Sequence, residues 1–176
     1  MKTNVALVGF MGTGKTVVGK VLAKKLNKGF VEMDSLIEQK AGRSIPEIFQ
    51  QDGEVVFREL EIEVTKEVSS KENLVIACGG GVVLNKINID RLRNGSIIVY
   101  LTASLRVILK RVLSEEGKRP LLNVPNKISE IKRLLKFREP FYERAADIKI
   151  DTSNLDIDAI AKQIIEKLKE DEGFHS

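Results

Sequence analysis

The chain has 176 residues, of which 43% are hydrophobic and 31% charged, as expected for one globular domain. Its single cysteine excludes an intramolecular disulfide, and no apolar stretch approaches the about 20 residues of a membrane-spanning helix. Because no signal peptide is visible either, we expect a cytoplasmic protein.

The formal net charge of +4 is concentrated in one part of the chain. Residues 103–149 hold twelve lysines and arginines against six acidic residues, so the remainder of the chain is slightly acidic. Aromatic residues make up only 5% of the chain, and none interleave with the basic residues as base stacking requires. The positive segment therefore predicts contact with a small polyanion rather than with nucleic acid.

Short, β-branched apolar runs alternate with segments of helical periodicity. The predicted strands cover residues 4–9, 30–33, 74–78, 96–101 and 147–151. The predicted helices cover residues 15–26, 46–69, 104–113 and 155–170. Continuously apolar strands between helices predict an α/β fold, with a parallel sheet covered by helices on both faces. Ligands of such sheets bind beyond the carboxyl ends of the strands.

The sequence "GFMGTGKT", residues 9–16, directly follows the first predicted strand and matches the P-loop pattern G-x-x-x-x-G-K-[ST]. Its glycines let backbone N–H groups point at phosphate oxygens, and the following helix adds its positive N-terminal dipole. Lys15 is expected to reach the β- and γ-phosphates, and the Thr16 hydroxyl to bind Mg²⁺. This stretch predicts a nucleoside triphosphate site.

Two features favour a small kinase over a GTPase or a motor ATPase. The sequence "NKIS" at 126–129 lacks the aspartate of a guanine-binding N-K-x-D motif and does not follow a strand. A motor ATPase usually has a larger chain and an acidic residue after a later strand, whereas here Asp34 already follows the second strand.

Asp34 lies where the second strand gives way to a helix, at the edge where ligands bind. Taken alone, Asp34 is most simply an N-cap, with Glu38 one turn later. Beside a P-loop, its carboxylate could instead accept or orient the proton of an attacking hydroxyl. Glu32, two residues earlier on the same strand face, is a candidate for the water shell of Mg²⁺.

In the segment "GEVVFRELEIEVTKEV", Glu61 falls on the buried apolar stripe and Arg58 lies three residues before it. A buried charge needs a partner. One interpretation is a surface ion pair worth about 0.3 kcal/mol. The other is an arginine held rigid by Glu61, so that its planar fork binds a substrate carboxylate.

Three consecutive glycines, Gly79–Gly81, come straight after the third predicted strand. A plain tight turn needs one or two glycines, so a run of three favours a loop whose backbone a ligand approaches closely. Cys78, just before them, is expected to be a small buried residue and receives no role.

The sequence "SEEGKRPLLNVPNK", residues 114–127, is the least periodic part of the chain and predicts a loop that can move. Closure of this loop could bring Arg119 onto the transferred phosphoryl group as an internal arginine finger. Arg138, in "KFREPFYERAAD", is expected at a helix end. For both arginines the alternative is a solvated surface charge. The residues after 170, "DEGFHS", are expected to fray, and His175 receives no role.

Together these residues resemble the shikimate kinase family. The resemblance covers nearly the whole chain in order, through "GFMGTGKT", "MDSLIEQKAGRSIPEIF", "DGEVVFRELE", "CGGG", "KRPLL" and "REPFYERAAD". It implies a three-layer P-loop kinase fold of the nucleoside-monophosphate-kinase type, with a five-stranded parallel sheet flanked by helices. A single domain would span residues 1–176, with substrate-binding helices at about 34–69 and a mobile lid at about 112–127.

The resemblance also implies an activity, the transfer of the γ-phosphoryl group of ATP to the 3-hydroxyl of shikimate in chorismate and aromatic amino-acid biosynthesis. The implied catalytic residues are Lys15, Asp34 and Arg119. The implied ATP-binding residues are Gly12, Thr13, Gly14, Lys15, Thr16, Val17, Arg111, Arg119 and Ser153. The implied shikimate-binding residues are Asp34, Arg58, Glu61, Gly79, Gly80, Gly81 and Arg138. Mg²⁺ would be held by Thr16 and, through water, by Glu32.

Two positions depart from the family pattern. Glu32-Met33-Asp34 stands where the family usually has Asp-x-Asp, and Cys78 stands where it often has a small hydroxyl residue. A gluconate-type sugar-acid kinase and a non-catalytic nucleotide- or RNA-binding protein are the alternatives. We expect ATP and shikimate as partners, a monomer, and no contact with nucleic acid or membrane.

Overall fold

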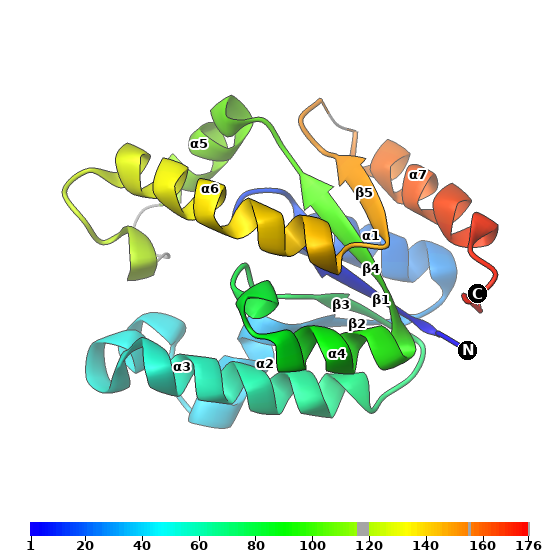
Figure 1. The fold of residues 1–176 in the computed structure, drawn as a ribbon, viewed down its shortest axis with the longest axis horizontal. Coiled ribbons are helices and arrows are strands. Elements are labelled where there is room, and N and C mark those ends of the chain that lie inside the picture. The colour runs from blue at the N-terminus through cyan, green and yellow to red at the C-terminus, as the bar shows by residue number, and fades with distance from the viewer. Residues whose placement is uncertain (116–119, 155, 176) are drawn as a thin grey trace.

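The computed structural model describes residues 1–115, 120–154 and 156–175. Its strands form one parallel sheet in the order β2-β3-β1-β4-β5 (Figure 1). The strands are β1 Asn4–Val8, β2 Gly29–Glu32, β3 Leu74–Ala77, β4 Ser96–Thr102 and β5 Ile148–Asp151. The α-helices are α1 Lys15–Leu26, α2 Met33–Ala41, α3 Ile45–Ser69, α4 Lys86–Gly95, α5 Leu105–Leu113, α6 Lys127–Ala145 and α7 Ile157–Glu170. Two 3₁₀ turns cover η1 Val82–Leu84 and η2 Pro120–Leu122.

The central strand β1 divides the hydrophobic core into two halves. All of its residues are buried, and alternate side chains point to opposite faces of the sheet. Val5 and Leu7 pack in a cluster with residues of α1 and α7. Ala6 and Val8 pack in the other cluster, with residues of α3, α4 and α6. This confirms the predicted three layers.

The five predicted strands are present within one or two residues of their expected ends. Helices α4 and α6 are the main elements that the sequence analysis did not delimit. In α6 the buried stripe includes the charged Arg138, and Pro140 lies inside the helix, so the apolar periodicity is interrupted. In α4, polar Asn88 is buried beside Ile89 and Leu92. No helix within the described ranges has the length and apolar character needed to span a bilayer.

The predicted helix at 46–69 is kinked. Gly53 has φ 82° and ψ 176°, which a helix does not contain and which glycine adopts without a steric cost. The helix begins with Ser44 as N-cap, whose hydroxyl accepts from the backbone N–H of Glu47, while the Glu47 side chain accepts from Ser44. The helix axis therefore changes direction at Gly53. From the part before the kink, Ile45 and Phe49 line the cavity described below.

The two ends of the described chain lie side by side (Figure 1). The backbone N–H of Lys2 donates to Gly173, and the N–H of His175 donates back to Lys2. The expectation of a frayed tail is therefore wrong for residues 171–175, because a short parallel bridge between Lys2 and Phe174 holds them.

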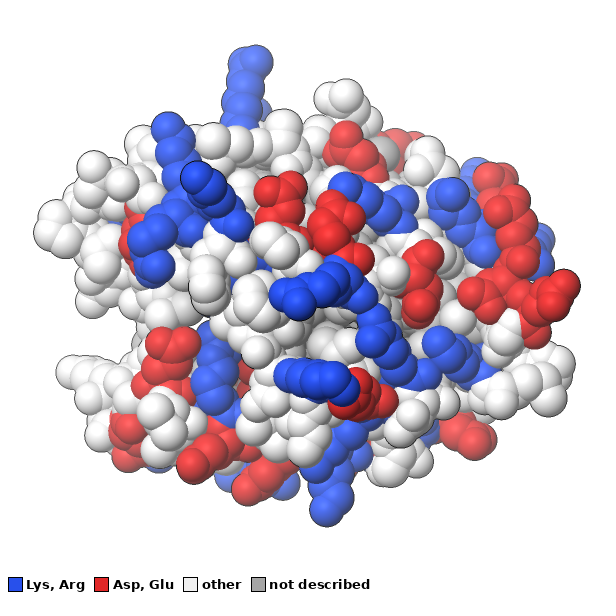
Figure 2. Space-filling view, in the orientation of Figure 1, with Lys and Arg blue, Asp and Glu red and all other residues white. Residues whose placement is uncertain are grey.

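Basic and acidic side chains are interspersed on the face that carries α4 and α6 (Figure 2). The positive charge of residues 103–149 therefore does not form one continuous basic patch on this face. Part of it, Arg111 and Arg138, instead lines the cavity described next.

Candidate active site

A cavity of about 570 Å³ opens at the carboxyl ends of β1 and β3, where the P-loop and the glycine run leave the sheet. Most of the predicted site residues line it: Gly12, Thr13, Gly14, Lys15, Thr16, Val17, Glu32, Asp34, Arg58, Glu61, Gly79, Gly80, Gly81, Arg111 and Arg138. Ser153 is not among the described lining residues. Arg119 lies outside the described residues.

The P-loop has the backbone shape that phosphate binding requires. Gly12 and Gly14 have φ of 77° and 92°, in the left-handed region that favours glycine. No described side chain caps α1, whose N-cap is Gly14. The Lys15 ammonium donates to the backbone carbonyls of Gly9 and Phe10, at 2.8 and 3.0 Å. These carbonyls hold the positive charge at the mouth of the loop, next to the N-terminus of α1.

Thr13 and Arg111 hold the P-loop to the rest of the fold. The buried Thr13 hydroxyl donates to the Phe10 carbonyl at 2.8 Å, and the Thr13 carbonyl accepts from the Thr152 hydroxyl at 2.8 Å. Arg111 donates to the carbonyls of Gly12 and Thr152, at 3.0 and 3.1 Å. Arg111 thus bridges the P-loop and the segment after β5.

Ser153 has a structural partner on each side. Its hydroxyl accepts from the backbone N–H of Ser104 at 2.7 Å and donates to the Asp151 carboxylate at 2.6 Å. Its position at the end of β5 joins this segment to the start of α5. The predicted contact of Ser153 with ATP stays a prediction.

Thr16, in α1, and Glu32, at the end of β2, both line the cavity and contact each other. The Thr16 hydroxyl donates to the Glu32 carboxylate at 3.0 Å. Within the described residues, no three His, Cys, Asp or Glu side chains cluster as a metal site. Mg²⁺ needs no such cluster, because it takes one or two protein oxygens and keeps several waters. A hydroxyl and a carboxylate at this spacing fit that donor set.

Asp34 is the second residue of α2 and does not cap it. The N-cap position belongs to Glu32, whose side chain makes no capping hydrogen bond. The N-cap interpretation of Asp34 is therefore wrong, because the helix begins at Met33, two residues earlier than an N-cap at Asp34 would require. Instead, Asp34 lines the cavity and its carboxylate packs against the backbone of Gly79.

Arg58 and Glu61 form a pair that is largely withdrawn from water. Arg58 donates to Glu61 at 3.0 Å, and the Glu61 side chain is only 2% exposed. Burial raises the pKa of Glu61, and the charge of Arg58 offsets this only in part. The interpretation of the pair as a surface ion pair is therefore wrong.

Glu54, a residue that the sequence analysis did not single out, also binds Arg58. The Arg58 Nε and Nη2 atoms donate to the same Glu54 oxygen, at 3.3 and 3.2 Å. Two carboxylates thus fix the guanidinium in the cavity wall. The spacing of Glu54 four residues before Arg58 could have indicated the contact.

The glycine run provides space for these side chains. A Cβ at Gly81 would lie 2.3 Å from Arg58 Nη1, and one at Gly79 would lie 3.0 Å from both Asp34 and Glu61. A Cβ at Gly80 would lie 3.4 Å from Arg138 Nη1. None of the three has a positive φ, so their use is close approach rather than backbone conformation.

Arg138 lies inside α6, not at its end as expected, and is only 3% exposed. Its guanidinium lies 6.0 Å from the centroid of the Phe10 ring. The interpretation of Arg138 as a solvated surface charge is therefore wrong. Together with Arg58, it gives the cavity lining two planar guanidinium groups in addition to the Lys15 ammonium.

An apolar wall closes the cavity beside Arg58. Its lining residues include Ile45, Phe49 and Phe57, and the two phenylalanine rings lie 4.8 Å apart. Their place in the site could not be predicted from the sequence, since such residues on an amphipathic helix most simply indicate core packing.

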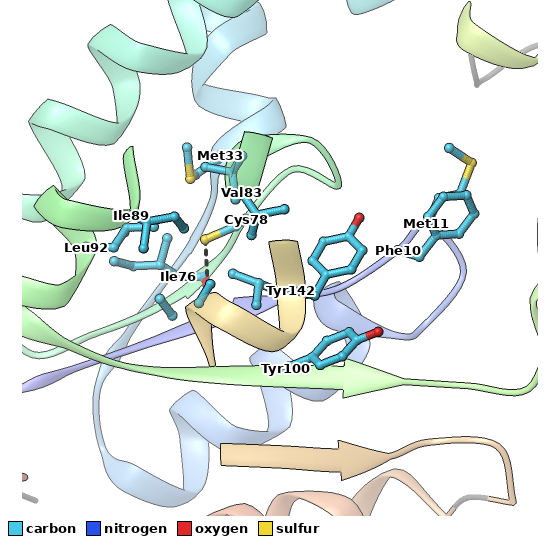
Figure 3. Packing of buried hydrophobic residues seen from close by; sticks show 14 of the residues in the cluster. Phe10, Met11, Met33, Ile76, Cys78, Val83, Ile89, Leu92, Tyr100 and Tyr142 are labelled. Atoms are coloured by element: carbon cyan, nitrogen blue, oxygen red, sulfur yellow. Dashed lines mark hydrogen bonds between the residues drawn. The ribbon is translucent and has the colours of Figure 1, made fainter. Parts of the chain in front are cut away.

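Cys78 is buried below the glycine run, among Ile76, Met33 and Val83 (Figure 3). Burial raises the pKa of its thiol to about 12. The thiol is therefore protonated at neutral pH and packs as a small apolar group, as the sequence analysis expected.

The comparisons with known proteins agree with one family. The sequence model of the shikimate kinase family matches residues 11–169. A shikimate kinase of Thermodesulfovibrio yellowstonii is 48% identical over 93% of this chain and 94% of its own length. One from Caldanaerobacter subterraneus is 47% identical over 92% of this chain and 94% of its own length.

Solved structures give the same result. A shikimate kinase from Acinetobacter baumannii in complex with shikimate superposes with a TM-score of 0.93 at 37% identity, covering 98% of this chain and 96% of that one. A gluconokinase from Sinorhizobium meliloti, at 18% identity and a TM-score of 0.59 over 96% of this chain and 93% of that one, shares the fold alone. The chain therefore belongs to the shikimate kinase family.

Proposed function

We propose that this cavity transfers the γ-phosphoryl group of ATP to the 3-hydroxyl of shikimate, giving shikimate 3-phosphate and ADP. The observation that carries the proposal is the convergence of a P-loop and two buried or half-buried arginines in one cavity of about 570 Å³. The product would serve chorismate and aromatic amino-acid biosynthesis, which is the role that family membership implies.

Arg58 and Arg138 form the acceptor half of the proposed site. A planar guanidinium binds a carboxylate through two parallel hydrogen bonds, and both arginines face the same cavity. Glu61 and Glu54 would orient Arg58, while Gly79–Gly81 leave room for the ring of the acid. The relative from Acinetobacter baumannii was solved with shikimate, the acceptor we assign to this chain.

Lys15, Thr16 and Glu32 form the donor half. The N–H groups of the P-loop and the Lys15 ammonium would bind the β- and γ-phosphates, with Arg111 stabilising the loop from behind. The Thr16 hydroxyl, with Glu32 acting through water, would hold Mg²⁺. When bound, Mg²⁺ neutralises negative charge on the phosphates. Arg119 would add a further positive charge on lid closure.

Asp34 lies between the two halves and would act on the attacking hydroxyl. The 3-oxygen of shikimate forms a bond to the γ-phosphorus as the bond to the β-γ bridging oxygen breaks, and ADP leaves. Asp34 accepts or orients the hydroxyl proton during this exchange. Most of the catalysis then comes from positioning and charge neutralisation.

A coupled assay of ADP release tests the proposal with shikimate, gluconate or no acceptor present. We expect turnover with shikimate, and background rates with gluconate and without an acceptor. Turnover with gluconate would support the sugar-acid alternative. An absence of ATP turnover, together with RNA binding that weakens steeply with salt, would support the non-catalytic alternative.

A further inference from the structure

The only two tyrosines of the chain stack on each other beside the cavity (Figure 3). Tyr142 comes from α6 and Tyr100 from β4, with ring centroids 5.1 Å apart and planes inclined by 24°. Both side chains are buried. Neither ring occurs among the described residues that line the cavity, yet Tyr142 lies one helical turn after Arg138.

The hydroxyl of Tyr142 reaches the glycine run. It donates a hydrogen bond to the Gly80 carbonyl. Burial raises the pKa of Tyr142 above its usual value, and the adjacent Arg138 guanidinium offsets this only in part. The phenol therefore keeps its proton and remains a donor. No described hydrogen bond involves the Tyr100 hydroxyl.

Arg58 and Arg138, the two arginines assigned to the acceptor, are held in different ways. Arg58 is fixed by the carboxylates of Glu54 and Glu61. Among the described residues, no ion pair involves Arg138, and its buried Nε atom has no hydrogen-bond partner. The Gly80 backbone and the Tyr142 phenol lie beside the Arg138 guanidinium and are themselves joined by a hydrogen bond. The Phe10 ring and the charge of Glu61 are its other described neighbours.

We propose that Tyr142 is a positioning residue, which holds the Gly80 backbone and the Arg138 guanidinium in the relative placement that binds the carboxylate of the acceptor. The proposal rests on the proposed function, since it assigns Arg138 to that carboxylate. A neutral phenol suits this task, because a carboxylate paired with Arg138 would compete with the substrate carboxylate for the guanidinium. Tyr142 touches no reacting atom, so its loss acts on acceptor binding more than on phosphoryl transfer.

The test compares Tyr142→Phe with Tyr100→Phe, which each remove one phenol oxygen from the same stacked pair. Tyr142→Phe is expected to raise the KM for shikimate about fivefold, the scale of one lost hydrogen bond. The KM for ATP and the kcat should change less than twofold. Tyr100→Phe should leave all three unchanged. An equal effect of both variants, or a normal KM for shikimate in Tyr142→Phe, overturns the proposal.

Arg138→Ala and the double variant Arg138→Ala/Tyr142→Phe separate this proposal from the proposed function. If Tyr142 acts through Arg138, removing its hydroxyl adds nothing to the KM for shikimate once Arg138 is gone. An additional fivefold increase in the double variant contradicts that route. If Arg138→Ala alone leaves this KM unchanged, the assignment of Arg138 to the acceptor carboxylate is wrong. Thermal melting and the KM for ATP report whether each variant folds.

Discussion

Glu61 carries a charge that the folded state disfavours. Its side chain is 2% exposed, one oxygen accepts from Arg58, and the other has no partner among the described residues. Because burial raises its pKa, the folded state binds the Glu61 proton more tightly than the unfolded state does. Its contribution to stability is therefore full below the unfolded pKa and is lost as the pH rises through the folded pKa.

The first prediction follows from the direction of the pKa shift of Glu61. Relative to Glu59→Gln, an exposed control on the same helix, Glu61→Gln should become progressively more stable as the pH rises from 4 to 8. The KM for shikimate should rise about tenfold only in Glu61→Gln, because Arg58 loses a charged hydrogen-bond partner. Urea unfolding at several pH values and steady-state kinetics measure both effects. A stability difference that shrinks with pH would show that the ionised carboxylate stabilises the fold.

The second prediction concerns Asp34, which we assign to the attacking hydroxyl. Asp34→Asn keeps the shape of the side chain and removes its ability to accept a proton. We expect kcat to fall by at least about 100-fold, the lower end of general-base catalysis. Affinity for ATP, measured by calorimetry, should stay within about twofold, because the P-loop binds the nucleotide. Asp90→Asn, on α4 outside the cavity, is the control.

A collapse of ATP affinity in Asp34→Asn would move Asp34 from the acceptor half of the site to the donor half. A nearly normal kcat would instead reduce it to a residue that shapes the cavity. Both outcomes contradict the assigned role of Asp34, and each indicates a different role for this residue.

At the scale of elements, the strands and the place where their carboxyl ends meet were predicted best from the sequence. Each strand is a short β-branched run, and parallel strands place their carboxyl ends at one edge, so residues far apart in sequence were expected to converge there. The P-loop, Asp34 and the glycine run do converge. Helix α6 was not delimited, because Arg138 interrupts its buried stripe. The left-handed Gly53 was not expected, since a glycine inside a helical pattern looks tolerable.

The role of the glycine run could be predicted from the sequence only in part. Its length indicated close approach, but not by which atoms. The structure shows that much of the approach is made by the protein itself, with Arg58, Asp34, Glu61 and Arg138 packed against it. Tyr142 was missed for a related reason, because a buried aromatic residue on a helix predicts packing and its hydroxyl partner lies 62 residues away along the chain.

Gly81→Ala is the third prediction. The added Cβ would lie 2.3 Å from the Arg58 guanidinium, which is the movable end of a long side chain, so Arg58 should move rather than the backbone. Since φ is −100° at Gly81, alanine adds no backbone strain. We expect a rise of more than about tenfold in the KM for shikimate, because a misplaced Arg58 loses a charged hydrogen bond.

The control is Gly95→Ala, where the added Cβ would make only ordinary contacts at 3.7 Å. The melting temperatures of the two variants should be similar, and only Gly81→Ala should lose affinity for shikimate. If Gly81→Ala melts far below the control, the backbone rather than Arg58 has moved.

At the scale of the whole molecule, the same core half that supports the cavity contains several groups that resist ionisation. These groups are Cys78, at the end of β3, Tyr100 of β4 and Tyr142 of α6, which all belong to the same cluster of buried residues. Burial raises the pKa of Cys78 and of Tyr100 to about 12, and raises that of Tyr142 as well. Each group keeps its proton in the folded state to a higher pH than in the unfolded state. The free energy of unfolding should therefore fall as the pH rises above about 9.

Cys78 makes this fourth prediction specific. The slope of the free energy of unfolding against pH is set by the protons that the folded state retains, about 1.4 kcal/mol per pH unit for one group. Cys78→Ala removes one such group, so its stability relative to the unsubstituted chain should improve by about that slope between pH 9 and 11. Urea unfolding across this range measures the difference, whatever the cost of the small cavity at neutral pH. Parallel curves for the two proteins would mean that the thiol ionises without unfolding, and that water reaches the core behind the glycine run.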